Sequence, residues 1–434
     1  RNRHFFLSHF FKDMYDDALR RLPNVSSGVT INKIEVWVTN RTGNYNDTRN
    51  ILAFTDLGEQ SRNDMQSPSQ WSVKGVSVPS NEANNVYQQL NEVILPQRSI
   101  NDVTKIMASY PNLYSARDYE KIENARMLSS SEYVLNDRLG YISLSQPLNN
   151  NEVLAVAYQY TYRGQTYKVG EFSTDGIDAP QSLFLKMLKG STLTPKFAAW
   201  DLMMKNIYSL NAYEVEQKDF DLNIVYCSDS TSNYVNYFSE GERPMNGGHN
   251  GETFLQILGL DRLNSQNDVS SDGRYDFIQG YTIDAKKGRV IFPMREPFAK
   301  SLEERIGDSR ISGKYAFHAL YDSTQVYAKQ QTSKNKFRLR GSYSSSASTD
   351  ISLNAFNVAQ GSVTVTAGGQ TLTENVDYSV DYSLGRVRII NQSILNSGQA
   401  INISYENESA ISTQTQTLVG AHLNYEINND WNIG

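Results

Sequence analysis

A short pattern that encodes a β-hairpin occurs three times in this chain. Each copy has a tyrosine, an apolar residue two positions later, Asn or Asp, three variable residues, a glycine and then alternating apolar positions. The copies begin and reach their glycines at Tyr133 and Gly140, Tyr281 and Gly288, and Tyr378 and Gly385. Asn or Asp opens a turn by hydrogen bonding to nearby backbone, and glycine supplies the positive φ that closes it. The pattern therefore predicts three antiparallel hairpins.

The first and third copies match beyond the hairpin itself. Apolar residues alternate after both of them, at Leu154, Val156 and Tyr158 and at Ile401, Ile403 and Tyr405. The three copies are unevenly spaced, which excludes a solenoid. One interpretation is that the copies converged on a common sequence pattern for hairpins. The other is that a β module was duplicated. The extended match favours duplicated modules that serve as scaffolding.

Apolar periodicity gives the remaining elements. Helical spacing predicts helices over residues 8–22, 81–94, 101–109, 116–128, 179–188, 196–210 and 314–329. Strands are predicted over residues 29–38 and 51–57, and the other segments are typical of strands and turns. The expected fold class is α+β and β-rich, with several mixed modules built from antiparallel strands and hairpins.

Charge and cysteine content exclude some partners and some stabilising devices. The formal net charge is −6, and the densest basic stretch, Lys334 to Arg340, alternates with apolar residues as one solvated strand face would. No groove for nucleic acid is therefore expected. The single cysteine, Cys227, allows no internal disulfide and lies in an apolar run that predicts a buried thiol. No run of eighteen apolar residues predicts a transmembrane helix.

The sequence offers little catalytic chemistry. Its five histidines are scattered, and it has no His-Glu-x-x-His, Gly-x-Ser-x-Gly, P-loop or dinucleotide motif. The sequence does not exclude a glycosidase or peptidase, because the paired carboxylates of such enzymes can lie far apart along a chain. We expect no enzyme and no cofactor.

One acidic loop has the oxygen ligands that Ca²⁺ prefers. Its carboxylates are Asp261, Asp268, Asp272 and Asp276, accompanied by Asn264, Asn267 and Gly273. The spacing differs from that of the twelve-residue EF-hand loop, and Asp and Asn are also common in ordinary turns. Calcium binding and a plain structural turn are therefore both open.

Several stretches resemble the SprA (Sov) family of cell-surface proteins. They are KIEVWVTNRTGNY (33–45), TRNILAFTDL (48–57), WDLMMKNIYSL (200–210), LGLDRLN (258–264), ISLNAFN (351–357) and residues 377–395. The resemblance covers nearly the whole chain, and none of these stretches is a generic catalytic or nucleotide motif. It implies the outer-membrane translocon of the Bacteroidetes type 9 secretion system, which also supports gliding motility. Members form a very large outer-membrane β-barrel that exports folded cargo proteins with C-terminal sorting domains, together with partner components at the barrel.

Members of that family are far longer than this chain, so the resemblance implies an internal piece inserted in the large β-barrel. The expected segments are a helix and strands at the barrel exit (1–60), three modules that each end in or contain one hairpin copy (61–175, 176–310 and 311–410), and the start of a barrel-type strand (411–434). Residues 419–427 alternate strictly between apolar and polar, as a membrane barrel strand or a half-buried soluble strand does. We expect the piece on the extracellular face of the outer membrane, with the periplasmic face as the alternative.

A second function class is an extracellular module that binds glycans or peptides on a bacterial surface. Such a module needs an exposed aromatic platform, and the candidates are Trp37, Trp71, Trp200 and Trp431. Packing in the core is the competing interpretation for the first three. The richness in tyrosine, 27 against 17 phenylalanines, suits surface β proteins under either hypothesis.

Overall fold

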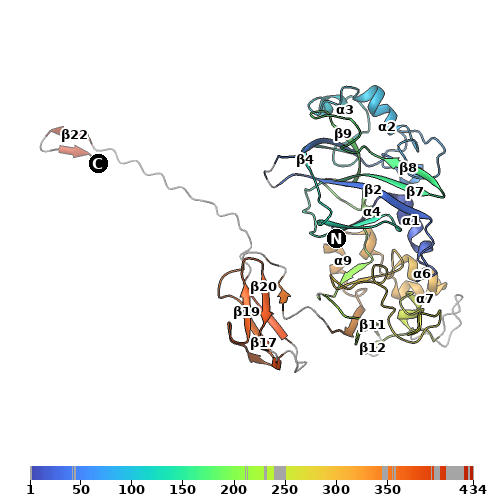
Figure 1. Cartoon of the computed structure of the whole chain (residues 1–434), viewed down its shortest axis with the longest axis vertical. Helices are drawn as coiled ribbons and strands as arrows, with labels where there is room; N and C mark the ends of the chain where they lie inside the picture. The colour runs from blue at the N-terminus through green and yellow to red at the C-terminus, as the bar shows by residue number, and fades with distance from the viewer. Residues whose placement is uncertain are drawn as a thin grey trace. The chain divides into compact units, whose positions relative to one another are not determined.

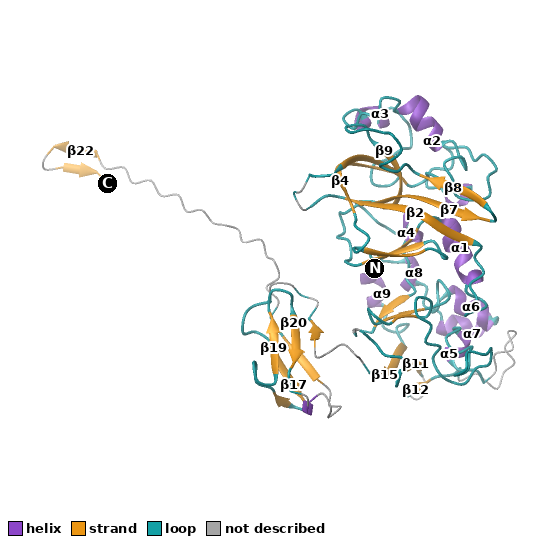
Figure 2. Ribbon diagram, viewed as in Figure 1, coloured by secondary structure: helices purple, strands orange, loops and turns teal. Residues whose placement is uncertain are grey.

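The chain forms two compact units, which are unit 1 (Arg1–Ser345) and unit 2 (Ser346–Gly434) (Figure 1). The computed structural model describes residues 2–41, 43, 45–210, 212, 214–228, 232–238, 251–344, 350–353, 355, 358–391, 393–394, 401–406, 425–428 and 431–433. Strands dominate both units, and short helices accompany them in unit 1 (Figure 2). Over the described part of the chain, no helix has the length and apolar character needed to cross a membrane. The five segments expected from the sequence stay a prediction.

Five strands of unit 1 close into a small barrel. They are β2 (Val29–Val38), β3 (Arg49–Phe54), β4 (Tyr119–Met127), β7 (Leu154–Tyr162) and β9 (Leu183–Lys189). The order around the barrel is β2-β4-β3-β9-β7, and β7 pairs back onto β2. The pairing of β3 with β9 is parallel, and the other pairs in the ring are antiparallel. β8 (Gln165–Val169) extends β7 outside the ring.

Small side chains make a five-stranded barrel possible. The cluster to which all five strands contribute contains Ala53, Ala125, Ala155 and Ala157, with Trp37 as its largest member. Because side chains alternate between the two faces of a strand, this cluster is the barrel interior. The members of this cluster are at most 4% exposed, so the interior is packed with side chains.

The segment between β3 and β4 covers one outer face of the barrel. It forms η1 (Arg62–Asp64), α2 (Val86–Gln89), a π-helical turn η2 (Leu90–Ile94) and α3 (Val103–Met107). Leu90 and Val103 pack with Phe54 of β3 in a shared apolar cluster, and Trp71 meets the Phe54 ring edge-on at 6.5 Å.

All three predicted hairpins form, and each is built into the same arrangement of strands. The hairpins are β5–β6 (Tyr133–Asn136, Tyr141–Leu144), β13–β14 (Ile283–Asp284, Arg289–Ile291) and β19–β20 (Tyr378–Asp381, Arg386–Ile389). In each case an earlier strand pairs with the second hairpin strand, and the three sheets are β1-β6-β5, β10-β14-β13 and β16-β20-β19. The added strands are β1 (His4–Phe6), β10 (Ile207–Ser209) and β16 (Asp350–Ser352).

A second pairing completes the repeat. The strand after the added strand pairs antiparallel with the strand after the hairpin, as β2 with β7, β11 (Asp221–Cys227) with β15 (Phe337–Ser342), and β17 (Thr364–Ala367) with β21 (Ile401–Ser404). We call these three sets module 1, module 2 and module 3. β12 (Tyr234–Val235) and β18 (Gln370–Thr371) extend β11 and β17. The shared topology supports the interpretation of duplicated modules.

The turn chemistry also repeats residue by residue. Asn136, Asp284 and Asp381 each accept a hydrogen bond through Oδ1 from the backbone amide three positions later, at 3.0, 3.2 and 3.0 Å. Gly140, Gly288 and Gly385 follow with φ of +64°, +54° and +58°. The positive φ is the conformation that glycine was expected to supply in each turn.

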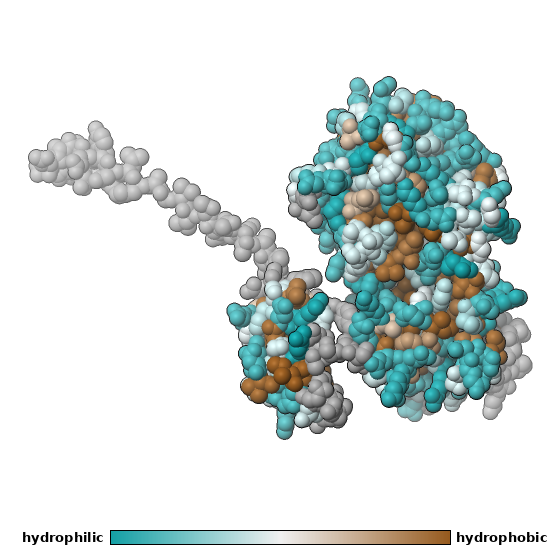
Figure 3. Space-filling view, viewed as in Figure 1, coloured by the Kyte–Doolittle hydropathy of each residue, from teal (hydrophilic) through white to brown (hydrophobic). Residues whose placement is uncertain are grey.

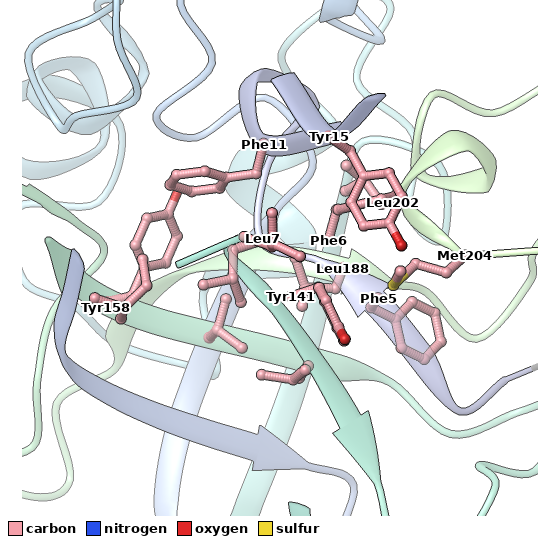
Figure 4. Close-up of a cluster of buried hydrophobic side chains, with 14 of the residues drawn as sticks. Phe5, Phe6, Leu7, Phe11, Tyr15, Tyr141, Tyr158, Leu188, Leu202 and Met204 are labelled. Atoms are coloured by element: carbon pink, nitrogen blue, oxygen red, sulfur yellow. The ribbon is translucent and has the colours of Figure 1, made fainter. Parts of the chain in front are cut away.

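Module 1 is closed by the first helix. α1 (His9–Ala18) buries Phe11 and Tyr15 against the strands of module 1, and Figure 4 shows both rings directed into the cluster. The Phe11 and Tyr158 rings meet edge-on at 5.9 Å, and those of Phe6 and Tyr15 meet at 5.5 Å. The hydroxyl of Tyr15 donates to the carbonyl oxygen of Phe292 at 2.9 Å, which ties module 1 to module 2.

A second core holds module 2 together. The helices that contribute to it are α5 (Phe254–Ile257), α6 (Lys300–Ile306), α7 (Ser309–Tyr315) and α8 (Ala319–Asp322). α9 (Gln325–Gln330) follows them in the chain, whereas α4 (Ala199–Leu202) packs in the core of module 1. Phe254, Leu302 and Tyr315 pack in one cluster with Ile224 of β11 and Val290 of β14. In β15, Phe337 and Leu339 face this core while Arg338 and Arg340 are exposed, so this part of the basic stretch is a solvated strand face as expected. Lys334 and Lys336 precede the strand and are half-buried.

Three predicted helices are wrong. Residues 116–128 contain β4, residues 179–188 contain most of β9, and residues 196–210 contain only the short α4 before β10. β9 is buried along its whole length, including Lys186 and Lys189. A short run that is mostly apolar has no periodicity that separates a buried strand from a buried helix. Pairing with β3 and β7 decides its structure.

Other predictions hold in part. Helices occur inside 8–22, 81–94 and 101–109, and 314–329 is broken into the end of α7, α8 and most of α9. Cys227 is half-buried and lies at the end of β11, so its predicted burial is only partial. In the C-terminal segment, β22 (Tyr425–Asn428) pairs with β23 (Trp431–Ile433), whereas residues 419–424 of the predicted barrel strand lie outside the described residues.

Candidate functional site

His9, Glu59 and Lys186 form a buried cluster of ionisable groups in unit 1. Oε1 of Glu59 accepts from Nδ1 of His9 at 2.9 Å and from Nζ of Lys186 at 2.7 Å. Lys186 also donates to the carbonyl oxygen of Thr55. Glu59 and Lys186 have no exposed surface, and His9 is 2% exposed. The cluster joins the start of α1, the segment after β3 and the middle of β9.

The partners of His9 fix its charge. Nδ1 faces the Glu59 carboxylate, and Nε2 lies 3.1 Å from the carbonyl oxygen of Ala198. Neither partner can donate a hydrogen bond, so both ring nitrogens must carry a proton. Burial alone would lower the pKa of His9, but the Glu59 carboxylate outweighs it and raises that pKa. The geometry therefore holds an imidazolium ion inside the protein.

The same charges set the state of Glu59. Burial would raise its pKa, whereas Lys186 and His9 beside it lower the pKa to about 2. An ionised carboxylate between two cations offsets their desolvation. Oε1 of Glu59 thus holds α1 and β9 together, whereas Oε2 is buried without a hydrogen-bond partner among the described residues.

A second buried ion pair lies at the rim of the barrel. Arg98 donates from Nη1 and Nη2 to the two carboxylate oxygens of Glu171, at 2.8 and 2.7 Å, in a bidentate pair. Glu171 also accepts from the hydroxyl of Tyr87 at 2.8 Å and from the amide of Phe184 at 2.8 Å. This pair ties β9 to the segment that covers the barrel.

Lys189, at the end of β9, is also buried. Its Nζ donates to the carbonyl oxygens of Asn150, Glu152 and Gly190, at 2.8, 2.6 and 3.0 Å. Burial lowers its pKa to about 8. Three carbonyl acceptors occupy all three ammonium hydrogens. The Lys189 amine therefore has a structural role and is not available as a nucleophile.

Five pockets on the described surface have linings to which none of these charged side chains belongs. A catalytic acid, base or nucleophile must come within hydrogen-bond reach of its substrate. These clusters can bear charge inside the protein, but they do not present it to a ligand.

The proposed calcium loop is organised by its own backbone. The Asp261 carboxylate accepts from the amides of Asp272 and Gly273, both at 3.1 Å. The Asp276 carboxylate accepts from the amides of Arg262 and Leu263, at 2.7 and 3.1 Å, and burial raises its pKa to about 6. Asp268 is exposed and donates its own amide to Asn264. Among the described residues no group of three His, Cys, Asp or Glu side chains is placed to hold a metal ion.

Three of the four candidate tryptophans are buried and therefore form no exposed platform for a glycan. Trp37, Trp71 and Trp200 are buried, at 1%, 4% and 5% exposed, and each belongs to an apolar cluster. The indole nitrogen of Trp200 donates to the carbonyl oxygen of Tyr321 at 2.7 Å. The side chain of Trp431 lies outside the described residues.

Sequence reasoning missed the buried charge clusters. Glu59 and Lys186 are 127 positions apart, and nothing local distinguishes either from a surface residue. The chain matches no model of a known protein family, and no curated protein matches it. The resemblance to the SprA (Sov) family therefore stays a prediction.

Proposed function

We propose that this chain is a non-catalytic structural part of an outer-membrane protein-translocation channel of the type 9 secretion class, which exports folded proteins to the cell surface. The observation that supports it is the threefold repetition of one β module, with the same strand order in modules 1, 2 and 3. Repetition of a β module is expected in a structural protein, because each copy adds rigid surface without adding reactive groups.

The buried ion pairs also support a structural role for this chain. The ion pairs of Glu59 with Lys186 and of Glu171 with Arg98 join segments distant in the sequence and are enclosed by the fold. Removing one partner of such a pair is strongly destabilising, so each ion pair fixes two specific segments of the chain to each other. This suits a body that must keep its shape beside passing cargo.

The wider assignment rests on the family resemblance. In this proposal the chain is inserted in a large outer-membrane β-barrel and stands on its extracellular face. Its partners are other secretion components at the barrel and cargo proteins with C-terminal sorting domains. No cofactor and no nucleic acid take part.

The function is tested by depletion of the full-length protein from the bacterium that carries it. Exported proteins are then quantified on the cell surface, in the medium and in the periplasm. We expect export to fall and the same proteins to accumulate in the periplasm. Unchanged export after complete depletion contradicts the proposal.

The extracellular assignment is tested with an epitope inserted at Gly75. This glycine is exposed, and a side chain added there meets no other atom within 4 Å. We expect antibody labelling of intact cells. Labelling only after permeabilisation assigns the chain to the periplasmic face, with an untagged strain and a tagged periplasmic protein as controls.

A further inference from the structure

A pocket of unit 1 lies between module 1 and module 2. It has a volume of about 520 Å³ and is lined from both modules and from α8 and α9. Pockets that hold small ligands have about 300–1,000 Å³. Apolar residues also gather on the surface of unit 1 between its barrel and its second core, as Figure 3 shows. The pocket therefore has the size and the setting of a ligand site.

The charged side chains that line this pocket are all positive. Four cationic side chains line it, Arg3, Lys205, Arg289 and Lys329, and no Asp or Glu is among the described residues of its lining. The chain as a whole carries a formal charge of −6, so this concentration of cations is local. Asp284 pairs across the hairpin with Arg289 but is not part of the lining.

His4 lies at the pocket beside the same cations. Burial and the nearby cations Arg289 and Arg3 lower its pKa well below the usual range, so the ring is neutral at pH 7. Its Nδ1 lies 2.8 Å from Oγ of Ser143. His4 lines the pocket and is 8% exposed.

The rest of the lining is apolar. Met204, Phe317 and Ala328 are buried at the pocket, and Ile207 and Leu320 are half-buried beside them. An anionic head group gains from the cations, and a short alkyl chain gains from this surface. A small hydrophilic anion would leave the apolar lining in contact with water.

We propose that this pocket binds an amphiphilic anion, a single carboxylate or phosphate head group carried on a short alkyl chain. Guanidinium groups such as those of Arg3 and Arg289 suit both head groups because their paired N–H donors match two oxygens. The proposal does not depend on the transport function, since it concerns a small ligand and not exported protein.

Binding is tested by calorimetry with the whole chain and four probes of equal tail length, which are octanoate, octyl phosphate, octanol and octylammonium. We expect octanoate or octyl phosphate to bind at least tenfold more tightly than octanol, and no binding of octylammonium. The tighter of the two anions identifies the head group. Absence of binding by both anions up to millimolar concentration overturns the proposal, as does equal binding of octylammonium.

Two variants locate the site. Lys329→Glu reverses an exposed charge of the lining without touching a core, and we expect about tenfold weaker binding of the anion. Lys300→Glu makes the same change on α6 outside the lining and should leave affinity unchanged. Equal loss in both variants, or in neither, contradicts binding at this pocket. Circular dichroism confirms that both variants are folded, and Arg3→Gln provides a second variant from module 1.

Discussion

The backbone amide of Leu210 donates a hydrogen bond to the carbonyl oxygen of Gly288 at 2.8 Å, and this bond joins β10 to the β13–β14 hairpin. Leu7 makes the same bond to Gly140 at 2.9 Å, and Leu353 makes it to Gly385 at 2.7 Å. The three modules thus share a backbone contact at equivalent positions, not only an order of strands. At Gly288 and Gly385 an added Cβ would clash with the backbone of the joining segment, and at Gly140 with the ring of Phe11, so each position has room only for glycine.

Gly288→Ala tests this contact. Gly288 has φ of +54°, and an added Cβ would clash with the carbonyl oxygen of Ala212. The left-handed backbone alone costs about 1–2 kcal/mol, and the clash adds to it. We expect the free energy of unfolding in urea to fall by at least that amount.

Gly313→Ala is the matched control, because Gly313 lies in α7 with open space around it. Alanine favours helix, so no loss of stability is expected there. If the two variants unfold at the same urea concentration, the proposed role of the module glycines is wrong.

Lys186→Met removes one partner of the buried Glu59 carboxylate. A buried charge that loses its partner costs about 3–5 kcal/mol, and we expect a loss toward the lower value because His9 still contacts Glu59. The double variant Lys186→Met with Glu59→Leu should be more stable than the single one, since it leaves no unpaired carboxylate. Arg20→Met breaks the exposed pair with Asp17 and should change stability little.

His9 makes unit 1 sensitive to pH. Its pKa is raised in the folded state, so its stabilising contribution is fully present below the unfolded pKa of about 6.5 and is lost as pH rises through the folded pKa. Urea unfolding of the wild type and of His9→Gln between pH 5.5 and 9 isolates this contribution. We expect the difference in stability between the two proteins to shrink at the alkaline end. A constant difference across the range argues against a buried imidazolium ion, and the half-exposed His318→Gln serves as control.

Trp71→Ala separates the structural interpretation from the glycan-binding alternative. Trp71 is buried beside Phe54, and truncation of a buried tryptophan costs about 3–5 kcal/mol. We expect a lower thermal unfolding temperature and no specific loss of glycan binding. Tyr45→Ala changes an exposed aromatic residue and should leave stability unchanged. Glycan binding by the wild type that disappears in a fully folded Trp71→Ala protein would favour the alternative.

The sequence alone determined the features that are local in the chain. The hairpin turns were predictable because an Asn or Asp side chain and a glycine at fixed spacing act on neighbouring backbone, as Asp381 and Gly385 do. β2 was predicted with its observed ends, since its apolar run is bounded by turn residues. The tripeptide Leu-Asn-Ala also occurs twice in the sequence, at 210–212 and 353–355. It follows β10 and β16, and could have identified them as the strands that pair with the second and the third hairpin.

Tertiary structure decided what depends on distant partners. β9 is a strand because β3 and β7 supply its backbone hydrogen bonds, and neither lies within twenty residues of it in the sequence. Lys186 is buried in that strand because Glu59 and Thr55 meet it there, whereas a lysine read from sequence is expected at the surface. The pocket between modules 1 and 2 arises in the same way, because its cations come from segments that only the packing of the two modules brings together.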